Sequence, residues 1–117
     1  MEGWDTSRLA IVFEKLEPLP HPSTLSITDI INISKQLLFA LYILHEKQSI
    51  VHMDIKPSNL MMKKTTNQNV ELKIIDFGLA TPYCQSINIT IGGTKGFFAP
   101  ELLGKKKKQS IQFNPIN

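Results

Sequence analysis

The sequence of 117 residues has little of several features that would assign it to a class of protein. It has one cysteine, Cys84, so it can form no internal disulfide, which excludes a disulfide-stabilised secreted domain. Its longest apolar run, residues 37–44, is far shorter than the roughly 20 residues that a membrane span needs. Glu2, Asp5 and Arg8 interrupt the N-terminus, which therefore lacks the apolar core of a signal peptide. We expect an intracellular protein of the cytoplasm or nucleus, without a membrane partner.

The excess of charge is also small. The chain has 13 Lys and Arg against 10 Asp and Glu, and four of the basic residues form the single run Lys105 to Lys108. The remainder is close to neutral and gives no basic surface of the kind that binds nucleic acid, so no nucleic-acid partner is expected. With 42% hydrophobic and 20% charged residues the composition is that of a globular protein. The length limits the chain to one domain or part of one.

The first third of the chain contains one strand-like run and a connection rich in proline. Residues 9–13 (LAIVF) are continuously apolar with β-branched and aromatic members, which predicts a buried strand. A buried strand needs neighbours on both sides, and residues 1–8 can supply at most one, so we expect the chain to begin inside a sheet. Pro18, Pro20 and Pro22 then predict an irregular connection.

A helix is predicted from Thr28 to about Lys47. Thr28 or Ser26 can cap it, and Asp29 suits its first turn. Apolar residues recur at steps of three and four, and this stripe is expected to face a core; it consists of Ile30, Ile33, Leu37, Leu41 and Leu44. Short strands are predicted at residues 50–51, 60–62 and 70–75, the last two joined by a polar loop. Residues 104–117 are predicted to form a Lys-rich disordered tail.

Residues able to do chemistry are concentrated in three short motifs. These are residues 52–59 (HMDIKPSN), residues 76–78 (DFG) and residues 99–101 (APE). Asn59 and Asp76 offer the hard oxygen ligands that suit Mg²⁺, which shares its remaining positions with water and substrate phosphates. Lys56 can neutralise a phosphate, and Asp54 can accept a proton from a hydroxyl. The residue types are those of phosphoryl transfer.

The three motifs, in this order and at this spacing, resemble those of the eukaryotic protein kinases of the serine/threonine type. The resemblance covers roughly residues 9–103 and implies an α+β, protein-kinase-like fold that is incomplete, with the hinge strand and the first half of the large lobe. It implies a partial kinase domain over residues 1–103 that uses ATP and Mg²⁺ on a protein substrate with Ser or Thr, and it leaves room for a regulatory subunit. Residues 26–30, 56–59 and 96–97 are also similar to the cell-cycle kinase that triggers replication-origin firing.

The resemblance also implies the role of each catalytic residue. Asp54 is the catalytic base, and Lys56 contacts the γ-phosphate of the nucleotide. Asn59 binds one Mg²⁺, while Asp76 is the principal Mg²⁺ ligand at the nucleotide. Thr94 bonds the base and the lysine, which is typical of kinases that act on Ser and Thr.

On the adenine side the resemblance implies a hinge over residues 13–16. Phe13 is the gatekeeper, the carbonyl of Glu14 and the amide of Leu16 meet adenine, and Met61 packs beneath the ring. His52 is expected to be a packed structural histidine. Phe77 is expected to be a core residue.

The sequence also departs from the family pattern. It contains no Gly-x-Gly-x-x-Gly loop followed by a strand lysine, and nothing after Glu101 resembles the later helices of the large lobe. Met53 stands where an arginine usually precedes the catalytic aspartate, so a phosphate on the activation segment would lack that partner. We therefore do not expect an activating phosphosite; the candidates were Thr81, Tyr83, Ser86 and Thr90. The chain alone is expected to be inactive, and the alternative is a non-catalytic kinase-like remnant that serves as a binding or scaffold fragment.

Overall fold

The computed structural model describes residues 3–5, 10–67, 69–82, 87–90, 92–104 and 108–111; of residues 4–5, 87–90 and 108–111 it describes the backbone alone. The strands and the long helix follow one another as β1 (Gly3–Asp5), β2 (Ala10–Val12), β3 (Glu17–Pro18), α1 (Ile27–Tyr42), β4 (Ile50–Val51), β5 (Leu60–Lys64), β6 (Val70–Ile74), β7 (Thr81–Pro82), β8 (Ile87–Thr90) and β9 (Lys108–Ile111). Short 3₁₀ turns lie at Pro22–Thr24, Pro57–Asn59 and Pro100–Leu102. A π-helical turn, Ile43–Lys47, continues α1.

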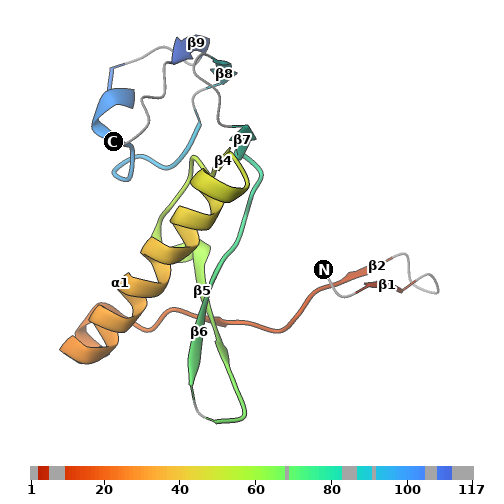
Figure 1. Cartoon of the computed structure of the whole chain (residues 1–117), viewed down its shortest axis with the longest axis vertical. Coiled ribbons are helices and arrows are strands. Elements are labelled where there is room, and N and C mark those ends of the chain that lie inside the picture. Colours follow the sequence, from red (N-terminus) through yellow and green to blue (C-terminus); the bar gives the residue numbers. More distant parts are fainter. Residues whose placement is uncertain are drawn as a thin grey trace.

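The centre of the molecule is an antiparallel sheet in the order β3-β5-β6, with α1 lying along it (Figure 1). The β5–β6 hairpin runs from the pair Leu60↔Ile74 to the pair Lys64↔Val70. Gln36 joins the helix to this hairpin, because its amide nitrogen donates to the Val70 carbonyl at 3.0 Å and its oxygen accepts from the Leu72 amide at 2.8 Å. The side chain thus satisfies backbone groups at the edge of β6. The strands predicted at residues 50–51, 60–62 and 70–75 are confirmed.

The beginning of α1 follows from local side-chain bonds. Ser26 is the N-cap: its hydroxyl accepts from the Asp29 amide at 3.1 Å, and the Asp29 carboxylate accepts from the Ser26 amide at 3.0 Å. This reciprocal capping box leaves two otherwise unpaired amides satisfied. Of the two caps considered from the sequence, Ser26 is correct, and with the π-helical turn the predicted end near Lys47 is confirmed.

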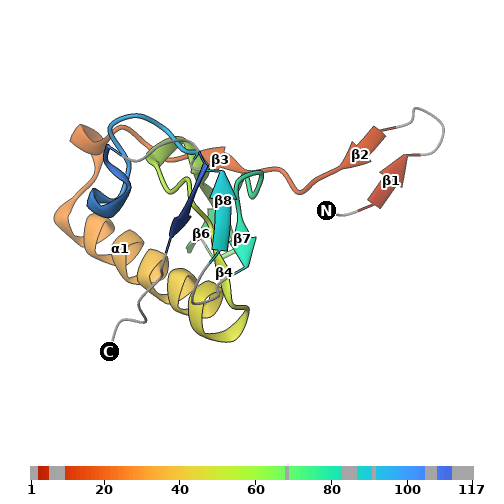
Figure 2. The same cartoon turned by 90° about the horizontal axis from the view of Figure 1, so that it is seen from above.

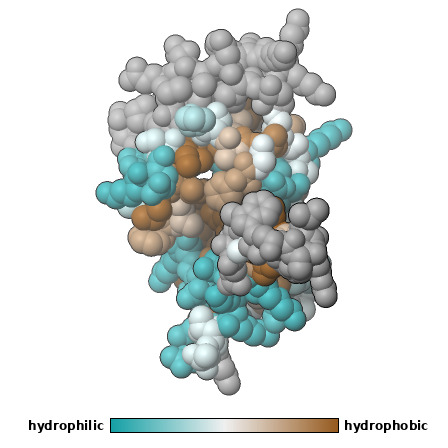
Figure 3. Space-filling view, turned by 90° about the vertical axis from the view of Figure 1, so that its right-hand side faces the viewer, coloured by the Kyte–Doolittle hydropathy of each residue, from teal (hydrophilic) through white to brown (hydrophobic). Residues whose placement is uncertain are grey.

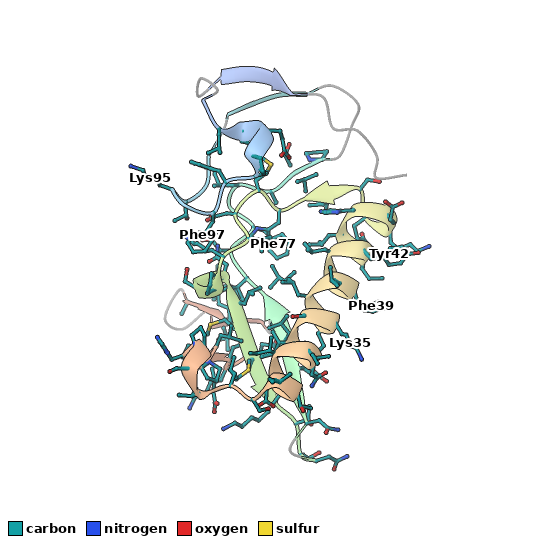
Figure 4. All side chains as sticks on the ribbon, turned by 90° about the vertical axis from the view of Figure 1, so that its left-hand side faces the viewer. Lys35, Phe39, Tyr42, Phe77, Lys95 and Phe97 are labelled. Atoms are coloured by element: carbon teal, nitrogen blue, oxygen red, sulfur yellow. The ribbon has the colours of Figure 1, made fainter. Side chains whose placement is uncertain are left out.

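The helix is only partly covered. Ile33, Leu37, Leu41 and Leu44 of the predicted stripe are half-buried, whereas Ile30 is exposed. Leu38 and Phe39 on the opposite side are 68% and 66% exposed, and Lys35, Phe39 and Tyr42 project away from the sheet in Figure 4. By length and composition alone, Ile27–Lys47 could cross a membrane, a test that a core helix of a water-soluble domain also passes. The expectation of no membrane partner stays a prediction.

The predicted buried strand at residues 9–13 is wrong in its burial. The described part of it, β2, pairs with β1 from Gly3↔Val12 to Asp5↔Ala10, but Ile11 and Val12 are 43% and 46% exposed. The β1–β2 hairpin projects from the rest of the molecule (Figure 2). Since β1 is its one strand neighbour among the described residues and no described layer covers it, an apolar sequence alone does not bury it.

The segment after residue 103 also differs from the expected disordered tail. Lys108–Ile111 form β9, which pairs with β8 from Ile87↔Ile111 to Thr90↔Lys108. A strand forms there because β8 supplies the donors and acceptors of an antiparallel ladder. The rest of that segment, residues 105–107 and 112–117, lies outside the described residues, as do Tyr83, Cys84 and Ser86. The domain boundary at residue 103 stays a prediction.

Candidate active site

The loop between β4 and β5 is built around His52, which is 1% exposed. The Asp54 amide donates to Nδ1 of His52 at 3.1 Å, so the ring proton is on Nε2, which donates to the Ile75 carbonyl at 2.9 Å. Met53 adopts a left-handed backbone with φ of 72°, which turns the chain between these two residues. His52 is thus the packed structural histidine that the sequence predicts. It fixes the loop to the end of β6.

The Asp54 carboxylate is the centre of a hydrogen-bonded cluster. Its Oδ1 accepts from the Thr94 hydroxyl at 2.9 Å, and its Oδ2 accepts from the Asn59 amide nitrogen at 3.3 Å. Lys56 Nζ lies 3.5 Å from Oδ2 and donates to the Thr94 hydroxyl at 2.5 Å. Asp54, Lys56, Asn59 and Thr94 are therefore brought together, although Thr94 is 40 positions from Asp54 in the chain.

This cluster decides the charge of Asp54. Burial alone would raise the pKa of the carboxyl, but the hydrogen bond from Thr94, the positive charge of Lys56 and the bond from Asn59 outweigh it, so the pKa lies below its ordinary value. Asp54 is consequently ionised at neutral pH. A hydrogen-bonded carboxylate whose second oxygen is next to a lysine can hold a substrate hydroxyl and receive its proton.

Asp76 follows β6 and is exposed. It has a left-handed backbone with φ of 61°, and its Oδ1 accepts from the Gly78 amide at 3.2 Å. The Ile75 amide donates to the Asn59 carbonyl at 2.9 Å, so the backbone next to Asp76 is bonded to that of the other predicted metal ligand. In the described part of the chain Asn59 uses its amide nitrogen for hydrogen bonds, which leaves its side-chain oxygen for a cation.

Phe77 differs from its predicted place in the core. Its ring meets that of His52 edge to face at 4.9 Å between centroids, but the residue is 46% exposed. One side packs on the loop, and no described element covers the other.

The predicted hinge, residues 13–16, lies between β2 and β3 and outside both strands. Phe13 is 65% exposed. Leu16 immediately precedes β3, which pairs with β5 through Glu17↔Met62 and Pro18↔Met61. The structure therefore brings the hinge segment beside the strand that carries Met61, as expected for an adenine site. The contacts of Glu14, Leu16 and Met61 with adenine stay predictions.

Sequence reasoning missed Lys63 and Lys73, which bind the side chain of the hinge residue Glu14. Lys63 Nζ donates to Glu14 Oε2 at 2.9 Å, and Lys73 Nζ lies 3.9 Å from Oε1. The signal was present in the predicted hairpin, since an antiparallel register places these two lysines diagonally on one face. Without the register, the acidic residue 49 positions away could not be assigned to them.

Apolar surface adjoins the loop between β4 and β5, residues 52–59. A cavity of about 240 Å³ lies between the end of α1, the loop and the segment before the 3₁₀ turn Pro100–Leu102; its lining includes Leu41, Val51, Ile55, Phe98 and Leu102. On the face shown in Figure 3, hydrophobic side chains gather across the middle of the molecule and hydrophilic ones at the lower end. The cavity shows that the described residues pack against only part of this loop.

Comparison with known proteins identifies the family to which this chain is similar. Residues 5–113 match the protein kinase domain. The human serine/threonine-protein kinase DCLK3 is 43% identical over 67 residues, which are 57% of this chain and 10% of that protein. The DNA damage response protein kinase DUN1 of Saccharomyces cerevisiae is 42% identical over 62% of this chain and 17% of its own length. The probable serine/threonine-protein kinase zyg-1 of Caenorhabditis briggsae is 36% identical over 68% of this chain and 11% of its own length. The chain thus spans a small part of the curated relatives that it matches.

Proposed function

Because this chain belongs to the protein kinase family, we propose a role for its described residues in phosphoryl transfer. They supply the base, metal and adenine sites for transfer from Mg·ATP to a protein Ser or Thr hydroxyl. The observation that carries the proposal is the cluster in which Asp54 is bonded to Thr94 and Asn59 and lies beside Lys56. A structural carboxylate would need one such partner. Here Asn59 and Lys56 of the same loop and Thr94 of a distant segment orient both oxygens, which is what a positioned base requires.

In the proposed reaction the substrate hydroxyl approaches Asp54 and its oxygen forms a bond to the γ-phosphorus. The bond from that phosphorus to the β,γ-bridging oxygen breaks, ADP leaves with the electron pair, and Asp54 takes the hydroxyl proton. Lys56 neutralises charge on the transferred phosphoryl group. Thr94 keeps the carboxylate and the ammonium group in register, because its hydroxyl donates to one and accepts from the other.

The residues present fit Mg²⁺. Asp76 offers an exposed carboxylate and Asn59 a side-chain oxygen, and the two lie on adjacent, hydrogen-bonded backbone segments. Among the described residues no group of three or more His, Cys, Asp and Glu could hold a metal by itself, which suits an ion that shares its coordination with water and nucleotide phosphates. Such an ion would neutralise phosphate charge when bound.

Phosphate transfer by these 117 residues alone is not expected. Most of the barrier reduction in this chemistry comes from positioning and charge stabilisation of the phosphates. The sequence contains no glycine-rich phosphate loop or strand lysine after it. The proposal for the chain is therefore a site competent to bind Mg-nucleotide, in an intracellular setting where ATP is present.

Titration of the full chain with ADP, with and without Mg²⁺, tests this proposal. We expect Mg²⁺ to tighten ADP binding, and Asp76→Asn to abolish that tightening because it removes the ionised ligand. Asp54→Asn is the matched control: it makes the same change of charge on the other carboxylate and should keep the Mg²⁺ effect. Absence of ADP binding, or equal loss in both variants, would contradict the assignment and favour the non-catalytic alternative.

A further inference from the structure

The sequence predicts a role for the backbone carbonyl of Glu14, but its side chain also makes contacts, and these are with the sheet. Its carboxylate lies between two lysines of the β5–β6 hairpin, at 2.9 Å from Lys63 Nζ and 3.9 Å from Lys73 Nζ. Lys73 also lies 3.5 Å from Glu71, which is opposite Lys63 in the hairpin register. Glu14 is thus the carboxylate of the hinge that the two lysines share.

Glu14, Lys63 and Lys73 stabilise one another electrostatically, and Glu71 is a second carboxylate beside Lys73. Two lysines placed diagonally on one face of a hairpin repel each other unless a carboxylate lies between them. The hydrogen bond from Lys63, with the charges of both lysines, outweighs desolvation and holds the pKa of Glu14 below its ordinary value, so the negative charge is present at neutral pH.

The backbone attaches the hinge to the sheet only weakly. Strand β3 has two residues, and one of them, Pro18, has no amide hydrogen to donate to the ladder. Ion pairs add side-chain links between this segment and β5–β6: Glu14 with Lys63 and Lys73, and Glu17 with Lys64 at 3.3 Å. The Glu17–Lys64 pair is the more exposed, with 51% and 65% of the side chains accessible.

The same hairpin carries two further parts of the proposed nucleotide site. Met61 on β5 is opposite Lys73 in the register, and β6 leads directly to Asp76. We propose that Lys63 and Lys73 are positioning residues for adenine: through the Glu14 carboxylate they hold the hinge, residues 13–16, at a fixed place beside Met61. The inference rests on the proposed nucleotide site and goes beyond it, because it assigns a role to two residues that would touch neither nucleotide nor metal.

Two measurements on the full chain test the inference. The first is amide hydrogen exchange of residues 15–17 without ligand, and the second is ADP affinity in the presence of Mg²⁺. Glu14→Gln should speed the exchange and weaken ADP binding by about threefold to tenfold, the range expected when exposed to half-buried ion pairs are lost. Lys63→Gln should do less because Lys73 remains. In the double variant Glu14→Gln/Lys63→Gln the two effects should be less than additive, since Glu14 and Lys63 are in direct contact.

Glu71→Gln is the matched control. It removes the same charge from the same cluster but leaves Glu14 with both lysines, so exchange at the hinge and ADP affinity should not change. Equal effects of Glu14→Gln and Glu71→Gln, or a lower melting temperature of Glu14→Gln with unchanged exchange and affinity in the folded protein, would overturn the inference. The proposed function would then still stand, provided that the wild type binds ADP. A wild type that binds no ADP would refute both the nucleotide site and the positioning role, whatever the exchange shows.

Discussion

The loop of residues 52–59 and the β1–β2 hairpin differ in how well the polarity of their sequences predicts burial. The loop contains the most deeply buried described residue, His52, and its polar groups are bonded to one another and to the end of β6. The β1–β2 hairpin contains the strand-like apolar run, yet the described side chains Ile11 and Val12 are nearly half exposed. From polarity alone, the apolar strand would be expected to be buried and the polar loop exposed.

The difference is explained by where the partners of each region lie. His52, Asp54 and Asn59 bond within a stretch of eight residues and to the adjoining Ile75. Ile75 directly follows β6, so the pairing of β5 with β6 places this partner beside the loop. An apolar strand, in contrast, is buried only when other layers cover it, and none of the described elements covers β2. The loop is therefore the more self-contained of the two regions, and within the site Thr94 comes from a distant segment.

The largest effect should be on activity, from replacing the two carboxylates of the proposed site: Asp54 on the loop and Asp76 after β6. In an active protein kinase domain that contains these residues, Asp54→Asn should lower turnover by about 10²- to 10⁴-fold, because a positioned base is lost, and leave Mg·ATP affinity nearly intact. Asp76→Asn should also weaken Mg·ATP binding, because it removes a metal ligand. Steady-state kinetics and nucleotide titration measure both. Equal loss of Mg·ATP affinity would show that the two roles are assigned wrongly.

A stability measurement compares the two regions directly. His52→Ala should destabilise the chain by about 2–4 kcal/mol, because it leaves a cavity and removes the bonds of the Asp54 amide and the Ile75 carbonyl. Val12→Ala should change the free energy of unfolding by less than about 0.5 kcal/mol, since the side chain is 46% exposed. Urea denaturation followed by circular dichroism gives both values. A larger loss for Val12→Ala would mean that β2 is buried in solution.

The sequence predicted features that depend on local signals and missed those that depend on distant segments. The capped helix and the short strands were predictable, because periodicity and capping chemistry are local signals. The cluster of Asp54, Lys56, Asn59 and Thr94 was implied by the family motifs, although Thr94 is 40 positions from Asp54. The exposure of β2 and Phe77, the pairing of β8 with β9 and the lysines around Glu14 were not. Each depends on which distant segments pack against the residue, and a single sequence does not specify that register.

The two faces of α1 repeat the comparison on a smaller scale. Leu37 is half-buried, so Leu37→Ala should destabilise the chain by about 1–2 kcal/mol, less than a fully buried leucine would. Leu38 is 68% exposed, so Leu38→Gln should change stability by less than about 0.5 kcal/mol and increase the monomer fraction. Thermal melts and size-exclusion chromatography distinguish the two. A Leu38→Gln variant that melts well below wild type would show that this face is covered, for instance by self-association.

The smallest effect concerns the cap of α1, a local device whose strength depends on pH. Ser26→Ala should destabilise the chain by about 1 kcal/mol at pH 7, because the hydroxyl that accepts the Asp29 amide is lost. The hydrogen bonds from the Ser26 hydroxyl and amide lower the pKa of Asp29 from its ordinary 3.8. A carboxyl with a lowered folded pKa contributes stability above its unfolded pKa and loses it as pH falls through the folded value. The difference in the free energy of unfolding between wild type and Ser26→Ala should therefore shrink below about pH 3.8 as Asp29 is protonated.

Ser34→Ala, the same replacement inside the exposed part of the helix, is the control and should be neutral or slightly stabilising at every pH. A constant difference across the acid range would mean that the Asp29 carboxylate takes no part in the cap in solution.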